Sequence, residues 1–145
     1  MTVALRHIGI VTSNIEKSIN FYTKILGFKV INDQIERGIF ISRLLGFNDT
    51  KVEVQTCKMT NGDFTLELLE FANPLPNETK CLINSLGCTH FAITVKDIDG
   101  IYLACSSEGA SFITPPSLSP DKKVRVAFLK DPNNEIYIEI VEELL

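Results

Sequence analysis

The feature that most constrains the fold of this chain is an internal repeat. When the sequence is shifted by 72 positions, residues 51–70 lie over residues 123–142 without a gap, and seven of the twenty positions are identical. Several of the others exchange one aliphatic residue for another, as two copies of one supersecondary unit do. The identical pairs are Lys51/Lys123, Val52/Val124, Val54/Val126, Lys58/Lys130, Asn61/Asn133, Glu67/Glu139 and Glu70/Glu142. The repeat predicts a duplicated fold.

A second match, at a shift of 83, joins the earlier parts of the two copies. Residues 6–22 then lie over residues 89–105. The aligned pairs include His7 with His90, Gly9 with Ala92, Asn14 with Asp97 and Ile15 with Ile98. Because the two shifts differ by 11, the first copy carries extra residues, and we expect the segment 37–47 to be this insertion.

Periodicity and turn residues predict the same order of elements in each copy. Alternating apolar residues predict strands, an Asn or Asp cap before apolar residues at helical spacing predicts a helix, and Asn61-Gly62 predicts a hairpin turn. The expected elements are a strand over 4–12, a helix from Asn14 to Gly27, a short strand over 28–31 and a hairpin of 51–58 and 64–71, then a strand over 88–96, a helix from Asp97 to about Ser107, a short strand over 111–114 and a hairpin of 123–131 and 135–142.

The fold class expected from these elements is α+β, with two tandem βαβββ modules. We expect a single domain over residues 1–145. Its parts are module one at about 1–72, a linker with two prolines at about 73–87, and module two at about 88–145.

Charge and composition exclude several classes of partner. The net charge of −4 and the lack of a basic stripe argue against nucleic acid. No apolar run approaches the ~20 residues that cross a bilayer. The first residues resemble a strand rather than a signal peptide, so we expect a cytoplasmic location and no membrane association. The four cysteines, Cys57, Cys81, Cys88 and Cys105, form no Cys-x-x-Cys pair, and we expect reduced, mostly buried thiols.

The two histidines of the chain, His7 and His90, occupy the same position of the repeat. A single histidine on an apolar strand is more often a hydrogen-bonded core residue, but a matched pair favours a shared role. Side chains alternate along a strand, so each histidine should lie on the face opposite the apolar residues that pack under the helix.

Glu67 and Glu139 also match each other, each on the face of its strand away from the buried aliphatic residues. An ionised carboxylate flanked by apolar residues is costly unless it is paired or binds a metal. Glu70 and Glu142 match as well, but they lie on the opposite faces near strand ends, and we expect them to be solvated.

Two imidazoles and two carboxylates that converge on one cavity would suit one divalent metal ion. Nitrogen and oxygen ligands without thiolate fit Zn, Ni, Co, Mn or Fe(II), and the ligand set alone does not choose among them. Four protein ligands in an octahedral shell would leave two positions for water or substrate, and a substrate with neighbouring oxygens needs these two positions to be adjacent. The predicted metal ligands are therefore His7, Glu67, His90 and Glu139.

Four segments of the chain resemble the glyoxalase/bleomycin-resistance/dioxygenase superfamily, also called vicinal oxygen chelate. They are HIGIVTSNIEKSINFYTKILGF, LELLEF, HFAITVKDID and KDPNNEIYIEIVE. The resemblance implies paired modules whose sheets curl around a metal-binding cavity, with the same four residues at the ligand positions. One segment departs from the family: its usual Asp-Pro-x-Gly-Asn turn reads Asp131-Pro132-Asn133-Asn134-Glu135 here. The internal match of Glu67 to Glu139 favours Glu139 over Tyr137 or Ile138 as the last ligand.

The ligand set resembles that of lactoylglutathione lyase and methylmalonyl-CoA epimerase. This implies a metal-dependent lyase, isomerase or epimerase that removes a proton next to a carbonyl through an enediolate or enolate, with Glu67 or Glu139 as the catalytic base. The family also contains ring-cleaving iron dioxygenases, thiol transferases and metal-free drug-binding proteins. The extra carboxylate Glu67 counts against the first two, and the complete ligand set counts against the third.

The substrate expected from the resemblance is a small α-carbonyl compound or thioester. Arg125, Arg43 and Gln55 could bind an anionic substrate, although a surface role is the more common one for such residues. We find no signature for glutathione or coenzyme A. Many proteins of this family form dimers, and exposed strand edges would permit a homodimer here.

Overall fold

The computed structural model describes residues 3–48, 50–87 and 90–144. The chain divides into two compact units, Met1–Glu78 and Thr79–Leu145, and each is described here by itself. Each unit is a βαβββ-like module with one mixed sheet and a long helix, so the predicted α+β class and the duplicated fold are confirmed. In the described ranges no helix is long and apolar enough to cross a membrane.

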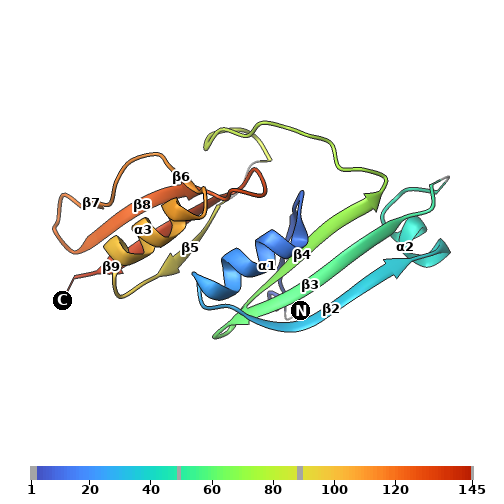
Figure 1. Ribbon diagram of the computed structural model, residues 1–145, viewed down its shortest axis with the longest axis horizontal. Helices are drawn as coiled ribbons and strands as arrows, with labels where there is room; N and C mark the ends of the chain where they lie inside the picture. Colours follow the sequence, from blue (N-terminus) through green and yellow to red (C-terminus); the bar gives the residue numbers. More distant parts are fainter. Residues whose placement is uncertain (1–2, 49, 88–89, 145) are drawn as a thin grey trace. The chain divides into compact units, whose positions relative to one another are not determined.

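The first module contains a four-stranded sheet in the order β1-β4-β3-β2 (Figure 1). β1 runs parallel to β4, and the other neighbours are antiparallel. Its elements are β1 (Ile8–Val11), α1 (Ile15–Lys24), β2 (Lys29–Arg37), α2 (Ile39–Leu44), β3 (Glu53–Asn61) and β4 (Phe64–Asn73). The predicted short strand at 28–31 is therefore too short, because the ladder with β3 continues to Arg37.

Helix α1 covers one face of this sheet. Asn14 caps it as predicted, since its side chain accepts a hydrogen bond of 2.9 Å from the backbone N–H of Lys17. After the helix, Gly27 has a φ of 72°, which an L side chain rarely adopts. The helix and the sheet share an apolar layer that is almost fully buried: Phe21 and Tyr22 of α1, with Cys57, Met59, Leu66 and Leu68 of the sheet.

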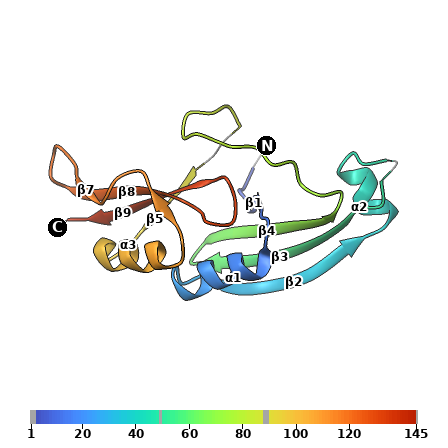
Figure 2. The same cartoon turned by 45° about the horizontal axis from the view of Figure 1, so that its top comes forward.

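Helix α2 is formed by the segment predicted as an insertion, and it lies on the other side of the sheet from α1 (Figure 2). Its buried Ile41 belongs to a small core with Val52 and Val54, against which Leu69 and Phe71 of β4 pack. Leu69 and Phe71 share the face of Glu67, because alternate residues of a strand point the same way. α2 therefore covers part of the face on which Glu67 lies.

The second module contains a sheet in the order β5-β9-β8-β6, with β7 also paired to β8. Helix α3 contacts β9, and the side chain of Asp97 caps the helix by accepting from the N–H of Gly100 at 2.9 Å. Its elements are β5 (His90–Thr94), α3 (Ile98–Ser107), β6 (Ser111–Phe112), β7 (Ser117–Leu118), β8 (Val124–Lys130) and β9 (Tyr137–Glu143). The part of the predicted strand at 88–89 lies outside the described residues.

The strand registers test the two shifts of the repeat. In the parallel ladders Gly9 pairs with Glu67 and Ala92 pairs with Glu139, so both shifts hold for these strands. In the hairpins, however, Glu67 lies opposite Lys58, whereas Glu139 lies opposite Phe128. The first hairpin strand therefore repeats at a shift of 70 rather than 72, and the identity of Lys58 with Lys130 is not a structural equivalence.

The physical reason is the length of the second hairpin loop. In the first hairpin the last pair is Asn61 with Phe64, which leaves a two-residue turn at Gly62, where φ is 60°. In the second hairpin the last pair is Lys130 with Tyr137, so the loop spans 131–136. The sequence match without a gap hid this longer loop.

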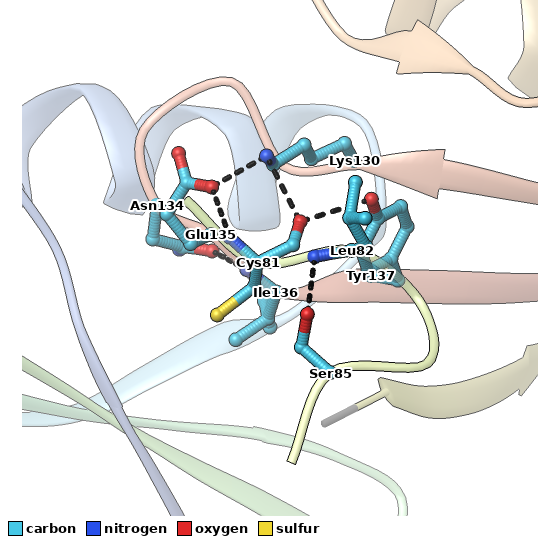
Figure 3. A network of polar contacts seen from close by, with 8 residues as sticks. All are labelled: Cys81, Leu82, Ser85, Lys130, Asn134, Glu135, Ile136 and Tyr137. Atoms are coloured by element: carbon cyan, nitrogen blue, oxygen red, sulfur yellow. Dashed lines mark hydrogen bonds and ion pairs between the residues drawn. The ribbon is translucent and has the colours of Figure 1, made fainter. Parts of the chain in front are cut away.

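This longer loop holds the end of the linker in place (Figure 3). The Glu135 carboxylate accepts a hydrogen bond of 3.0 Å from the backbone N–H of Cys81 and also pairs with the Lys130 ammonium at 2.5 Å. The Cys81 carbonyl accepts from Lys130 at 3.4 Å and from the Tyr137 hydroxyl at 3.2 Å. Glu135 stands where the family's turn has Asn, and here it anchors the linker to its own module.

Candidate metal centre

The first module brings His7 and Glu67 together. His7 immediately precedes β1, and Glu67 lies in the middle of β4, which pairs with β1. The distance from His7 Nε2 to Glu67 Oε1 is 3.6 Å, and the side chains are 28% and 16% exposed. Ile10, on the other face of β1, is buried, as are Leu66 and Leu68 beside Glu67. The alternation inferred from the sequence therefore places both polar residues on the face away from α1.

The second module repeats this arrangement with His90 and Glu139. His90 Nε2 lies 3.7 Å from Glu139 Oε2, and the side chains are 47% and 27% exposed. Phe91, Ile138 and Ile140 occupy the buried face of the same strands. Each module thus presents one imidazole and one carboxylate at equivalent positions of its parallel ladder.

The two pairs lie in different units of the chain. Within the described ranges, no three His, Cys, Asp or Glu side chains gather closely enough to hold a metal ion. The structure thus brings the four predicted ligands together as two pairs, and the set of four remains a prediction.

The two pairs differ in the side chain that lies across the hairpin from the glutamate. In the first module Lys58 Nζ lies 3.4 Å from Glu67 Oε2. In the second module the ring of Phe128 meets the imidazole of His90 edge to face, with the ring centroids 5.3 Å apart. Neither residue was predicted from the sequence, although counting back from the Asn61-Gly62 turn places Lys58 opposite Glu67.

Two of the three residues considered for anion binding have protein partners. Arg125 forms a bidentate pair with Asp99 of α3 at 2.7 and 2.8 Å, and Glu142 lies 3.6 Å away. Hydrogen bonding to Arg125 lowers the pKa of Asp99 and raises that of Arg125. The side-chain amide of Gln55 donates to Asp33 at 2.9 Å. Arg43 lies on the exposed side of α2.

Glu70 and Glu142 lie on the faces opposite Glu67 and Glu139, as predicted, but they are not merely solvated. Glu70 accepts a hydrogen bond of 2.6 Å from the backbone N–H of Ile15, the first residue of α1. Glu142 reaches α3 through Arg125. The expectation failed because the N-terminus of α1 lies above Glu70 and because Arg125 lies between Glu142 and Asp99 of α3, which strand periodicity cannot reveal.

Three cysteines are described, and all are free thiols. Cys57 and Cys105 are buried, and this burial raises their pKa values to about 11 and about 12. The expectation of buried, reduced thiols is confirmed for these two residues, while Cys81 is half-buried. Cys88 lies outside the described residues. Protonated, buried thiols are poor metal ligands, so the candidate donors remain nitrogen and oxygen.

The fold and the twin pairs define a class of protein: a duplicated βαβββ chain with one imidazole and one carboxylate on each module. The model of the Glyoxalase/Bleomycin resistance protein/Dioxygenase superfamily matches residues 4–140. The chain belongs to this superfamily, whose members often bind divalent metals.

Two curated relatives have similar sequences. The lactoylglutathione lyase of Schizosaccharomyces pombe is 28% identical over 148 aligned positions, which cover 98% of this chain and 48% of the relative. This chain therefore spans about half the length of that enzyme. The uncharacterised protein YwkD of Bacillus subtilis is also 28% identical, over 97% of both chains.

Solved structures agree on the fold. A glyoxalase family protein from Bacillus cereus superposes with a TM-score of 0.88 at 21% identity, over 100% of this chain and 97% of that one. The trypanothione-dependent glyoxalase I of Leishmania major gives a TM-score of 0.67 at 20% identity, over 98% and 88%. At these identities the likeness extends to the fold alone.

Proposed function

We propose that this protein is a divalent-metal-dependent lyase, isomerase or epimerase of the glyoxalase type. Its reaction would remove a proton next to a carbonyl group and return it after an enediolate or enolate has formed. The observation that carries the proposal is the repeated His–Glu pair, with nitrogen-to-oxygen distances of 3.6 and 3.7 Å in the two modules. Both pairs lie on the faces that the helices α1 and α3 leave open.

The donor atoms suit a metal ion. Two ligand atoms at ~2.1 Å from one ion lie ~3.0 Å apart at a right angle and ~3.4 Å apart at a tetrahedral angle. The observed separations of 3.6 and 3.7 Å exceed the right-angle value by about 0.6–0.7 Å and the tetrahedral value by about 0.2–0.3 Å, which side-chain rotations would remove. We propose that His7, Glu67, His90 and Glu139 together bind one Zn, Ni, Co, Mn or Fe(II) ion.

In this mechanism the bound ion would act as a Lewis acid towards the carbonyl oxygen of the substrate. The two histidines would hold the ion through neutral imidazole nitrogens. One of the two glutamates would take the substrate proton with a carboxylate oxygen and later return it to the neighbouring carbon. Both are only 16–27% exposed, which limits the access of bulk water to the transferred proton.

We propose that the substrate is a small α-carbonyl compound or thioester. We also propose that the protein acts as a homodimer in the cytoplasm. The name of the Schizosaccharomyces relative suggests a glutathione hemithioacetal as one member of the test panel. The rival function is drug binding without a metal ion. It would need neither His–Glu pair, so metal analysis separates the two functions.

The experiment is metal analysis of purified protein together with turnover on a panel of α-carbonyl substrates. We expect one metal ion per chain in the wild type and almost none in His7→Ala, Glu67→Gln, His90→Ala and Glu139→Gln. Glu143→Gln is the matched control, since Glu143 lies on β9 but at its exposed end. Each ligand variant should lose activity with its metal, while circular dichroism shows an unchanged fold.

Stoichiometry separates the shared site from two independent ones. If the four residues share one ion, loss of either pair removes all of the metal. Two ions per chain, with half retained in His7→Ala, would show that each pair acts alone and would refute the four-ligand site. Unchanged metal content in all four variants would refute the ligand assignment.

A further inference from the structure

We propose that Lys58 is an anion-binding residue of the substrate site, which selects α-carbonyl substrates with a negatively charged oxygen close to the reacting group. The proposal rests on the proposed function and deepens it, because it names a chemical property of the substrate. It is carried by the position, exposure and charge of Lys58 on the open face of the first module.

The register of the hairpin places Lys58 beside the candidate ligands. Lys58 on β3 pairs directly with Glu67 on β4, which in turn pairs with Gly9 on β1. Directly paired residues share a face of the sheet, so Lys58 lies on the same open face as His7 and Glu67. The ammonium is 3.4 Å from Glu67 Oε2, whereas His7 approaches the other oxygen, Oε1.

The Lys58 ammonium has capacity for a second anionic partner. Its side chain is 38% exposed, and an ammonium group carries three N–H donors. Glu67 can occupy one of them at the observed distance. Two other cations are engaged differently: carboxylates of structural networks hold Arg125 at 2.7 Å and Lys130 at 2.5 Å. Among the described lysines and arginines that form ion pairs, Lys58 is the one whose partner is a candidate ligand.

The charge balance of the site favours an anion there. The two glutamates bring two negative charges, which a divalent ion would cancel, and the imidazoles bind as neutral groups. The positive charge of Lys58 then remains without compensation within the ligand set. A positive charge that is partly shielded from water attracts a ligand carboxylate and forms charge-assisted hydrogen bonds with it.

The second module supplies an internal comparison. At the position equivalent to Lys58 it has Phe128, whose ring lies against His90. An aromatic ring gives packing but no hydrogen bond to an anion. If Lys58 served only to neutralise Glu67, a lysine would be needed equally opposite Glu139. That position holds Phe128 instead. The difference therefore points to ligand recognition in the first module.

The test uses two chelating probes that differ by one carboxylate. Propionohydroxamic acid and succinic acid monohydroxamate carry the same metal-chelating group, and only the second carries a carboxylate. We would measure their dissociation constants on Zn-loaded wild type by calorimetry. We expect about tenfold tighter binding of the carboxylated probe, a preference equivalent to one charge-assisted contact. Lys58→Met should bind both probes equally, and Lys58→Arg should keep the preference.

Lys17→Met is the matched control, since Lys17 is exposed on α1. It should behave like the wild type. The proposal is overturned if Lys58→Met keeps the preference. It is also overturned if Lys58→Met and Lys58→Gln lose zinc or fold, because Lys58 would then only support Glu67. If the zinc-loaded wild type binds neither probe, the proposed function fails and this proposal with it.

Discussion

Glu67 and Glu70 lie three residues apart on β4, and their opposite faces predict opposite consequences of mutation. Glu67 lies on the open face beside His7 and Lys58, whereas Glu70 accepts a hydrogen bond of 2.6 Å from the first N–H of α1. Replacement of Glu67 should affect metal binding with little effect on stability. Replacement of Glu70 should affect stability with little effect on metal binding.

The magnitudes follow from the contacts. A hydrogen bond to a charged group contributes roughly 1.5–3 kcal/mol, and a carboxylate at a helix N-terminus gains roughly 0.3–1 kcal/mol from the helix dipole. Because Glu70 is partly exposed, we expect Glu70→Ala to lower the free energy of unfolding by about 2 kcal/mol. Glu67→Ala loses the partly exposed contacts of Glu67 with Lys58 and His7, so it should change the free energy of unfolding of the metal-free protein by roughly 0–1 kcal/mol.

The assay is urea unfolding of the metal-free protein, monitored by circular dichroism, together with zinc titration of each variant. Glu70→Gln separates charge from geometry, because the amide oxygen can still accept a hydrogen bond from Ile15. Its free energy of unfolding should fall by about half as much as that of Glu70→Ala. The reasoning is refuted if Glu70→Ala is as stable as the wild type. It is equally refuted if Glu67→Ala is the less stable variant and still binds zinc normally.

Two further predictions concern Glu135, which anchors the linker, and the cysteine thiols. Pairing with Lys130 lowers the pKa of Glu135. The stability that Glu135 adds is therefore present at neutral pH and is lost as the pH falls through this lowered pKa. Glu135→Gln should be as stable as the wild type only in acid, and less stable at neutral pH. An equal difference at every pH would contradict this. At pH 8 iodoacetamide should label Cys81 well before Cys57 and Cys105, whose burial raises their pKa values. Equal labelling rates by mass spectrometry would argue against this burial.

Much of the site was already contained in the sequence. The repeat located the matching strands and the residues His7, Glu67, His90 and Glu139 within them. Alternation then predicted which face each side chain occupies, because a strand turns successive residues to opposite faces whatever the rest of the fold does. The caps Asn14 and Asp97 were predictable for the same reason, since each acts on N–H groups only three residues away.

Tertiary structure alone decided how those strands are paired and what lies above them. A gap-free match equated Lys58 with Lys130, whereas the longer loop at 131–136 places Phe128 opposite Glu139. Glu70 became a helix-capping residue only because α1 packs over its face of the sheet. Local periodicity is set by bonds within one segment. The pairing of β1 with β4 and the contact of Glu70 with α1 join segments 55–58 residues apart in the chain, so no local pattern reveals them.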